Sequence, residues 1–409
     1  MRKYYSRLII SLLTVLFGMR AALLPFALLK TQVASAATDY YVATTGSDSN
    51  PGAQSQPFKT IRKGSQVATA GTTVHVAAGT YTETIRTTQS GTASSRIRFV
   101  SYVKWGAKII PPANSTREHV WDIRGNYVDI NGFEVDGSNC TSCIIGIYMG
   151  GSYDRVINTH VHNIANNIPC YQHGASGITA DHYYGGVHNN VIGNVVDHIG
   201  VDQCNFYHGI YMSTSGIVKN NIVNNVSAYG IHLWHDATNV TVVNNTVFNN
   251  GSAGSDGGGI VIGSGDYYNF SGPGDYNIVA NNIVYNNLGW GIVETGNTGT
   301  HNTYTNNLVY GNITNWGLQN GLTHTNTITA DPRFVNYLVD GTGNYHLAAD
   351  SPAIDRGIKA SYVPTTDFDG TIRPQGAAPD IGAYEYGGGD TTPPTISNGS
   401  PTDTLSLVH

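Results

Sequence analysis

One short motif recurs six times between Arg155 and Asn312, and it restricts the fold more than any other feature of the chain. Each copy places an asparagine or an equivalent residue just before a stretch that ends in valine, and Gly-Ile pairs are interleaved with the copies. The isoleucines of these pairs are 31, 32, 21, 29 and 32 residues apart. A motif that recurs at a basal step of about 20 residues, lengthened by insertions, is typical of a solenoid whose insertions lie on one side. The six copies begin at Asn158, Asn194, Asn220, Asn244, Asn281 and Asn306.

The motif also predicts which side chains face the core. Valine and isoleucine alternate with other residues in short strands, as in parallel strands that bury one face. Val161, Val196, Val223 and Val247 are expected to point inward. The recurring asparagines are expected to form an inward ladder at a turn, because buried polar groups are normally hydrogen-bonded and each amide can bond to the coils above and below.

Residues 1–36 have the features of a secretory signal peptide. Three basic residues lie within the first seven, an apolar run starts at Leu8, and Ala34-Ser35-Ala36 offers a small-residue cleavage site. We therefore expect an exported protein, secreted or held at the cell surface.

The charge of the chain after residue 36 excludes nucleic acid as a partner. The leader holds five basic and no acidic residues, which leaves 16 of the 21 Lys and Arg against all 27 Asp and Glu, a net charge of −11. Nucleic-acid binding needs a basic face. A polyanionic sugar would in turn require a cation or a local basic patch to bridge the repulsion.

Four cysteines after the leader fit an oxidising compartment. Cys170 and Cys204 lie in the insertions of successive coils, so we favour a disulfide between them. Cys140 and Cys143 would then pair with each other or stay reduced. A zinc site at this pair is the alternative, but it lacks a second pair of ligands.

The first 50 residues after the leader carry a recognisable opening. Thr45–Gly52 reads TGSDSNPG, Pro57-Phe58-Lys59-Thr60-Ile61 follows, and Val74–Tyr81 reads VHVAAGTY. We expect a strand, a loop, a short helix over 61–70 that caps the core, and the first coil strand, since a solenoid end needs a cap. This opening resembles the right-handed parallel β-helix (pectate-lyase-like) superfamily. The resemblance implies a right-handed parallel β-helix over 37–386 and carbohydrate-related work.

The pattern changes from about residue 330. Asp331-Pro332-Arg333-Phe334 and Pro379–Tyr386 resemble the carboxy-terminal segment of secreted bacterial β-helix proteins that often carry cell-surface anchoring modules. We interpret 330–386 as a terminal wrap of the β-helix. Residues 387–409 are interpreted as a Gly, Thr and Pro linker and the start of an immunoglobulin-like module that is cut short and disordered.

Two columns of outward-facing side chains on neighbouring coils contain most of the candidate functional residues. Because side chains alternate between the two faces of a strand, the neighbours of the inward valines point outward, and acids and histidines occupy these positions. Adjacent coils are about 4.8 Å apart, so these side chains are expected to lie close together. A second column follows the Gly-Ile pairs. Long insertions with His173, Asp202 and His208 lie between the two columns, and the short link after Ser227 is expected to open a notch beside them. The first column comprises Glu134, Asp136, His160, His162, Asp197 and His198, and the second comprises Tyr148, Thr179, Tyr211 and His232, with Asp181, Trp234, His235 and Asp236 beside it.

Taken as one polysaccharide site, these residues suit a lyase that acts on a uronate-containing chain. β-Elimination needs a base for the C5 proton, an acid for the leaving oxygen and a cation for the carboxylate. Histidine and tyrosine can take the first two roles, and Asp136 with Asp197 could hold Ca²⁺. The predicted catalytic residues are His162, Asp181, Asp197, His208, Tyr211, His232 and His235, and the predicted substrate-binding residues are Tyr148, His173, Tyr183 and Trp234.

Two other functions remain open. A glycoside hydrolase needs two carboxylates across the scissile bond, which Asp181 with Asp197, Asp202 or Asp236 could supply. A non-catalytic solenoid could instead bind an extracellular polysaccharide or serve in adhesion, with its histidines only capping turns. Pectate lyases of this fold use Arg or Lys as base, and Lys219, the only lysine in these coils, is expected beside the asparagine turn. We expect a monomer.

Overall fold

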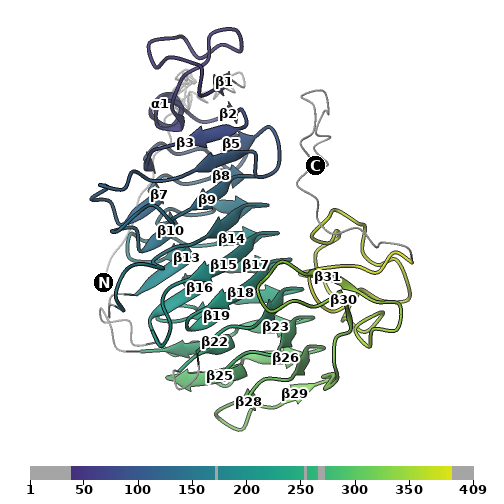
Figure 1. Cartoon of the computed structure of the whole chain (residues 1–409). Coiled ribbons are helices and arrows are strands. Elements are labelled where there is room, and N and C mark those ends of the chain that lie inside the picture. Colours follow the sequence, from purple (N-terminus) through teal and green to yellow (C-terminus); the bar gives the residue numbers. More distant parts are fainter. Residues whose placement is uncertain (1–37, 171–173, 253–255, 266–271, 389–409) are drawn as a thin grey trace, which may run out of the picture. The chain divides into compact units, whose positions relative to one another are not determined.

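Three parallel β-sheets run along the chain, and each coil contributes one strand to each sheet in turn (Figure 1). The computed structural model describes residues 38–170, 174–252, 256–265 and 272–388. Sheet A has 11 strands, and sheets B and C have 9 each. This is the predicted all-β parallel solenoid.

Sheet A consists of β1 (Thr38–Val42), β2 (Thr72–Val76), β5 (Ile97–Ser101), β8 (Val128–Asn131), β11 (Arg155–Ile157), β14 (Asn189–Ile192), β17 (Gly216–Lys219), β20 (Val240–Val243), β23 (Ile278–Ala280), β26 (Thr303–Thr305) and β29 (His324–Thr325). Sheet B consists of β4 (Ile85–Thr87), β7 (His119–Ile123), β10 (Ile145–Met149), β13 (Ala175–Asp181), β16 (Tyr207–Ser213), β19 (Tyr229–Leu233), β22 (Gly258–Ser264), β25 (Trp290–Gly296) and β28 (Thr314–Gly317). Sheet C consists of β3 (Gly79–Tyr81), β6 (Ala107–Ile109), β9 (Glu134–Asp136), β12 (His160–His162), β15 (Val195–Ile199), β18 (Ile222–Val226), β21 (Thr246–Phe248), β24 (Ile283–Tyr285) and β27 (Leu308–Tyr310).

The inward valines lie where alternation predicts. Val161, Val196, Val223 and Val247 are fully buried and belong to one continuous hydrophobic core. Each coil buries only its inner side chains against the coils above and below, so the repeat extends the core without thickening it.

The recurring asparagines form the predicted ladder at the turn from sheet A to sheet C. The Oδ1 of Asn245 accepts a hydrogen bond from the backbone N–H of Asn221 at 2.9 Å, and Asn282 Oδ1 does the same for Asn245 at 3.0 Å. The Nδ2 of Asn245 donates to Val218 O at 2.9 Å. These bonds satisfy backbone groups that the bend removes from the sheets.

Asn245→Ala is expected to lower the free energy of unfolding by several kcal/mol. The substitution leaves the backbone N–H of Asn221 and the carbonyl of Val218 buried without partners, at about 1–3 kcal/mol for each. Urea denaturation followed by circular dichroism measures the effect. Asn190→Ala, on a partly exposed position of β14, is the matched control and should change stability by about 0.5 kcal/mol or less. Equal effects of the two variants would contradict a structural ladder.

A short helix covers the β1–β2 end of the core (Figure 1). Helix α1 (Ile61–Val67) starts at the N-cap Thr60 and buries Ile61 and Gly64. The carboxylate of Glu83 accepts hydrogen bonds from the first two backbone N–H groups of the helix at 2.8 and 2.9 Å. The helix is three residues shorter than predicted, because the chain turns at Ala68 into an extended conformation.

The segment after sheet C folds back over the outer face of that sheet. It contains the antiparallel hairpin of β30 (Phe334–Asn336) and β31 (Asn344–Leu347). Tyr345 and Tyr384 pack on Ile222 and Phe248 of the later coils, and Leu347 belongs to a second such cluster. The outward positions of these coils are therefore apolar because they are covered.

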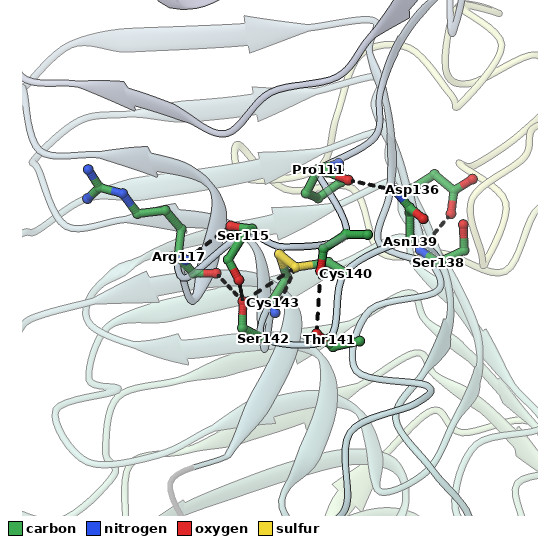
Figure 2. The surroundings of a disulfide bond; sticks show 11 residues. Pro111, Ser115, Arg117, Asp136, Ser138, Asn139, Cys140, Thr141, Ser142 and Cys143 are labelled. Atoms are coloured by element: carbon green, nitrogen blue, oxygen red, sulfur yellow. Dashed lines mark hydrogen bonds between the residues drawn. A yellow bond between two sulfur atoms is a disulfide. The ribbon is translucent and has the colours of Figure 1, made fainter.

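The predicted disulfide between Cys170 and Cys204 is present, and of the alternatives left open for Cys140 and Cys143 the structure has the disulfide. Cys170 pairs with Cys204, across a separation of 34 residues, and Cys140 pairs with Cys143 (Figure 2). The loop around Cys140 is tied to the preceding coil, since Ser142 Oγ donates to Ser115 O at 2.6 Å (Figure 2). Both bonds are typical of proteins that mature in an oxidising compartment.

Two predicted segments, the signal peptide at 1–36 and the immunoglobulin-like start after residue 388, lie outside the described residues. Within the described ranges, no helix has the length and hydropathy that crossing a membrane requires.

Candidate functional site

The column after the Gly-Ile pairs lies on the outer face of sheet B, as predicted. In register, Tyr148 pairs with Thr179, Thr179 with Tyr211, and Tyr211 with His232. The residue before each of them is a buried isoleucine, so alternation turns these four side chains outward on consecutive strands.

His232 is the centre of an aromatic cluster on this face. Its ring centroid lies 3.9 Å from that of His208, 5.0 Å from Tyr211 and 5.2 Å from Trp234. Tyr211 and His232 are partly exposed, whereas His208 is buried. The buried Nδ1 atoms of His208 and His232 have no hydrogen-bond partner among the described residues. The name histidine–tyrosine site is used below for His208, Tyr211, Tyr229, His232, Trp234 and His235.

Burial sets the protonation of this site. It lowers the pKa of His208 to about 3, and burial together with His208 and His235 lowers the pKa of His232 well below its ordinary value. Burial also lowers the pKa of His235 and raises that of Tyr211. At neutral pH the site therefore presents neutral imidazoles and a protonated phenol, the forms that a general base and a general acid need.

Asp181 and Tyr148 border the site on the side of the earlier coils. Asp181 accepts hydrogen bonds from Tyr148 Oη at 2.7 Å and from Ser213 Oγ at 2.6 Å, so both of its oxygens have donors. Tyr183, two residues after Asp181, is 55% exposed, and its ring centroid lies 4.8 Å from that of Tyr184. The ring of His235 is 6.5 Å from that of Tyr211.

Sequence reasoning missed the basic residue beside this border. The guanidinium of Arg124 lies 4.7 Å from the ring centre of Tyr148 and 3.7 Å from that of Tyr184, and it pairs with Asp122. Extending the Tyr148 column back by one strand reaches Asp122, which would have pointed to this pair. Tyr229, which donates to Asp256 at 2.6 Å, was also missed.

The first predicted column lies on sheet C, so the expectation of one shared site is wrong. His160 and His162 pair in register with Glu134 and Asp136 on one side, and His162 pairs with Asp197 on the other. The column of Tyr211 belongs to sheet B. His162 and Asp197 are thus brought together with each other but not with Tyr211, because the turn from sheet C to sheet B separates the two outer faces. The name sheet C cluster is used below for Lys108, Glu134, Asp136, His160, His162 and Asp197.

The carboxylates of the sheet C cluster are already paired. Lys108 Nζ lies 2.9 Å from both Glu134 Oε1 and Asp136 Oδ2. Asp197 bonds to His160 Nε2 at 2.6 Å and to His198 Nδ1 at 2.5 Å. Burial raises the pKa of Asp197, but the two histidine bonds outweigh burial and hold the pKa well below its ordinary range.

The predicted Ca²⁺ pair, Asp136 and Asp197, lies on β9 and β15 with His162 between the two residues. Among the described residues, the set of potential ligands whose atoms all lie within 4.8 Å of one another is instead Glu134, His160 and His162. Two of these three residues are imidazoles, which suit transition metals better than Ca²⁺.

The remaining predictions fall at the edges of the two faces. A hollow at the turn from sheet C to sheet B is lined by His198, Asp202 and Ser227, at the place of the predicted notch. Lys219 ends β17 in sheet A beside the asparagine turn, away from the histidine–tyrosine site. His173 lies outside the described residues.

Comparison with known proteins agrees with this architecture. Residues 40–326 match the family described as Pel9A-like, right handed beta helix region. The uncharacterized protein YwoF of Bacillus subtilis (strain 168) is 32% identical over 177 residues, which are 40% of this chain and 36% of that protein. The chain thus matches about a third of the length of this curated relative.

The crystal structure of pectate lyase Pel9A has the same fold. It superposes with a TM-score of 0.62 at 20% sequence identity, and the match covers 85% of this chain and 96% of that chain. The family match spans the cap and most of the coils, including the histidine–tyrosine site, and it gives the hand of the solenoid. The chain belongs to the Pel9A-like right-handed β-helix family.

Proposed function

We propose that this protein is a polysaccharide lyase that cleaves a uronate-containing chain by β-elimination at the histidine–tyrosine site. The observation that carries the proposal is the placement of Tyr211 and His232 on neighbouring strands with ring centroids 5.0 Å apart. Burial raises the pKa of Tyr211 and lowers that of His232, which favours a protonated phenol beside a neutral imidazole. The family and the fold shared with a pectate lyase support carbohydrate chemistry in general.

In this proposal His232 is the base and Tyr211 the acid. His232 removes the proton from C5 of the uronate, the electron pair of that C–H bond forms the C4–C5 double bond, and the bond from C4 to the glycosidic oxygen breaks. Tyr211 gives its proton to the departing oxygen. Burial sets the starting state for both steps, because it keeps the imidazole unprotonated and the phenol protonated before the reaction.

Binding of a polyanionic chain also needs positive charge on this face. Arg124, beside the exposed Tyr184, can bind a uronate carboxylate of the same chain a few strands from the reacting sugar. Resident Ca²⁺ fits the described residues of this face poorly. Ca²⁺ takes about 6–8 oxygen ligands, and the carboxylate of Asp181 is already bonded to Tyr148 and Ser213. A Ca²⁺ requirement would therefore depend on oxygens supplied by the substrate.

A substrate panel tests the proposal. The protein is incubated with pectate, alginate and glycosaminoglycans, with Ca²⁺ or with a chelator, and the ultraviolet absorbance of the new double bond is followed. The expected result is an absorbance rise with at least one substrate. New reducing ends without a rise in absorbance would show that the protein is a glycoside hydrolase and not a lyase. Retention of a polysaccharide with no products would indicate a binding solenoid.

The value of kcat/KM is expected to stay constant as the pH falls below the ordinary pKa of histidine. A base must be unprotonated, and burial lowers the pKa of His232, so activity persists as the pH falls below about 6.5. Burial raises the pKa of Tyr211, so the acid stays protonated as the pH rises. Initial rates between about pH 5 and 9 check this. Half-maximal activity at or above pH 6.5 would contradict a base whose pKa is lowered.

We also propose that the protein works outside the cell as a monomer, with an extracellular polysaccharide as its partner. The two disulfides support this location.

A further inference from the structure

The sheet C cluster is organised around two stacked histidines. On β12, His160 and His162 flank the buried Val161, so both imidazoles point outward from one strand. Their rings are 4.2 Å apart and tilted by 19°. Glu134, on the neighbouring strand β9, pairs in register with His160 and bonds to His162 Nε2 at 2.9 Å. Strand β12 thus presents two potential nitrogen ligands side by side, and the neighbouring strand β9 presents a carboxylate beside them.

Both imidazoles are held by neighbouring side chains. Asp197 bonds to His160 Nε2 at 2.6 Å, and Asn163 Nδ2 donates to His162 Nδ1 at 2.8 Å. Metal-binding histidines usually donate the N–H of the other ring nitrogen to a carboxylate or carbonyl, as His160 Nε2 can to Asp197. An ion at His162 Nε2 would take the place of the hydrogen bond to Glu134, with the ring proton on Nδ1 and the Asn163 amide turned so that its oxygen accepts that proton.

The charge of the cluster also suits a divalent cation. Glu134, Asp136 and Asp197 contribute three carboxylates, and Lys108 contributes one ammonium group. With neutral imidazoles, two negative charges remain to be balanced. Figure 2 shows Asp136 at the start of the disulfide loop, where the backbone N–H of Ser138 donates to it at 3.0 Å.

We propose that Glu134, His160 and His162, whose ligand atoms all lie within 4.8 Å of one another, bind a transition-metal ion of the Zn²⁺ type at a site separate from the histidine–tyrosine site. Two imidazoles and one carboxylate are a common ligand set for such ions, and they leave a fourth position open. The ion would link β9 to β12 and thereby join two successive coils. Asp197 orients His160, and Lys108 competes with the ion for Glu134.

Titration with Zn²⁺ tests the proposal. The full chain is stripped with a chelator, dialysed, and titrated with Zn²⁺ alone in a calorimeter, while its Tm is measured with and without the ion. One ion should bind per chain and raise the Tm. Glu134→Gln and His162→Ala should weaken binding at least tenfold and abolish the Tm rise. Glu134→Gln keeps a hydrogen-bonding side chain of the same size, so a folded variant remains available.

Two further variants locate the ion. Lys108→Met removes the competing ammonium group and should tighten Zn²⁺ binding. His232→Ala, in the histidine–tyrosine site, should bind Zn²⁺ as the wild type does. The proposal is overturned if no stoichiometric binding occurs, if Lys108→Met does not bind more tightly, or if His232→Ala loses the ion while His162→Ala keeps it.

Discussion

His232→Ala is expected to lower kcat/KM for a uronate polysaccharide by about 10²–10⁴-fold, the usual contribution of a positioned general base. Tyr211→Phe should cost a similar factor, because it removes only the phenolic proton donor. Both side chains are partly exposed on the outer face of sheet B. The substitutions should therefore leave the Tm within a few degrees of the wild type.

Two matched variants separate chemistry from packing. His188→Ala removes an exposed histidine that stacks on Tyr153 at the turn into sheet A, and it should retain full activity. The double variant of Tyr211 and His232 should be about as slow as the slower single variant, since acid and base act in one step. Full activity of the His232→Ala variant would show that His232 is not the base.

Glu385→Ala is expected to lower the free energy of unfolding of the carboxy-terminal wrap by about 3–5 kcal/mol, because it leaves a buried charge without a partner. Arg373 and Glu385 form an ion pair at 2.8 Å, and each side chain is 1% exposed. Glu385 also accepts from the backbone of Gln375 and Asp380 at 2.9 and 3.0 Å. Denaturation curves and limited proteolysis of residues 330–388 measure the loss.

An exposed ion pair in the same segment provides the control. Arg333 and Asp350 are 55% and 69% exposed, so Arg333→Ala should change stability by about 1 kcal/mol or less. Replacing Arg373 and Glu385 together by Met and Leu should recover much of the loss, since neither member of this pair is then left buried without the other. Similar losses from Glu385→Ala and Arg333→Ala would show that burial of the pair is unimportant.

The repeat made the fold predictable to the level of single residues. A coil repeats its geometry, so the position of Val161 or Asn245 in the motif specifies whether its side chain faces inward, and both residues lie where alternation places them. The helix end was less predictable, because nothing in the sequence from Ala68 to Ala70 marks the change to extended backbone that ends the helix at Val67.

The candidate sites were predictable along each sheet but not between sheets. The register of Glu134 with His160 and of Tyr211 with His232 is as predicted. The prediction that His162 and His232 belong to one site was wrong, because a repeat gives the position of a residue within its coil but not the angle between the sheets. Arg124 was missed because it lies beyond the copies of the motif.

Product analysis in water enriched in heavy oxygen tests the central claim most directly. Elimination adds no water to the chain, whereas hydrolysis transfers one water oxygen to the product. Mass spectrometry of the fragments should therefore show no heavy oxygen, and one fragment of each cleavage should carry an unsaturated uronate at its end. One heavy oxygen per cleaved bond, with no unsaturated end, would contradict the lyase assignment.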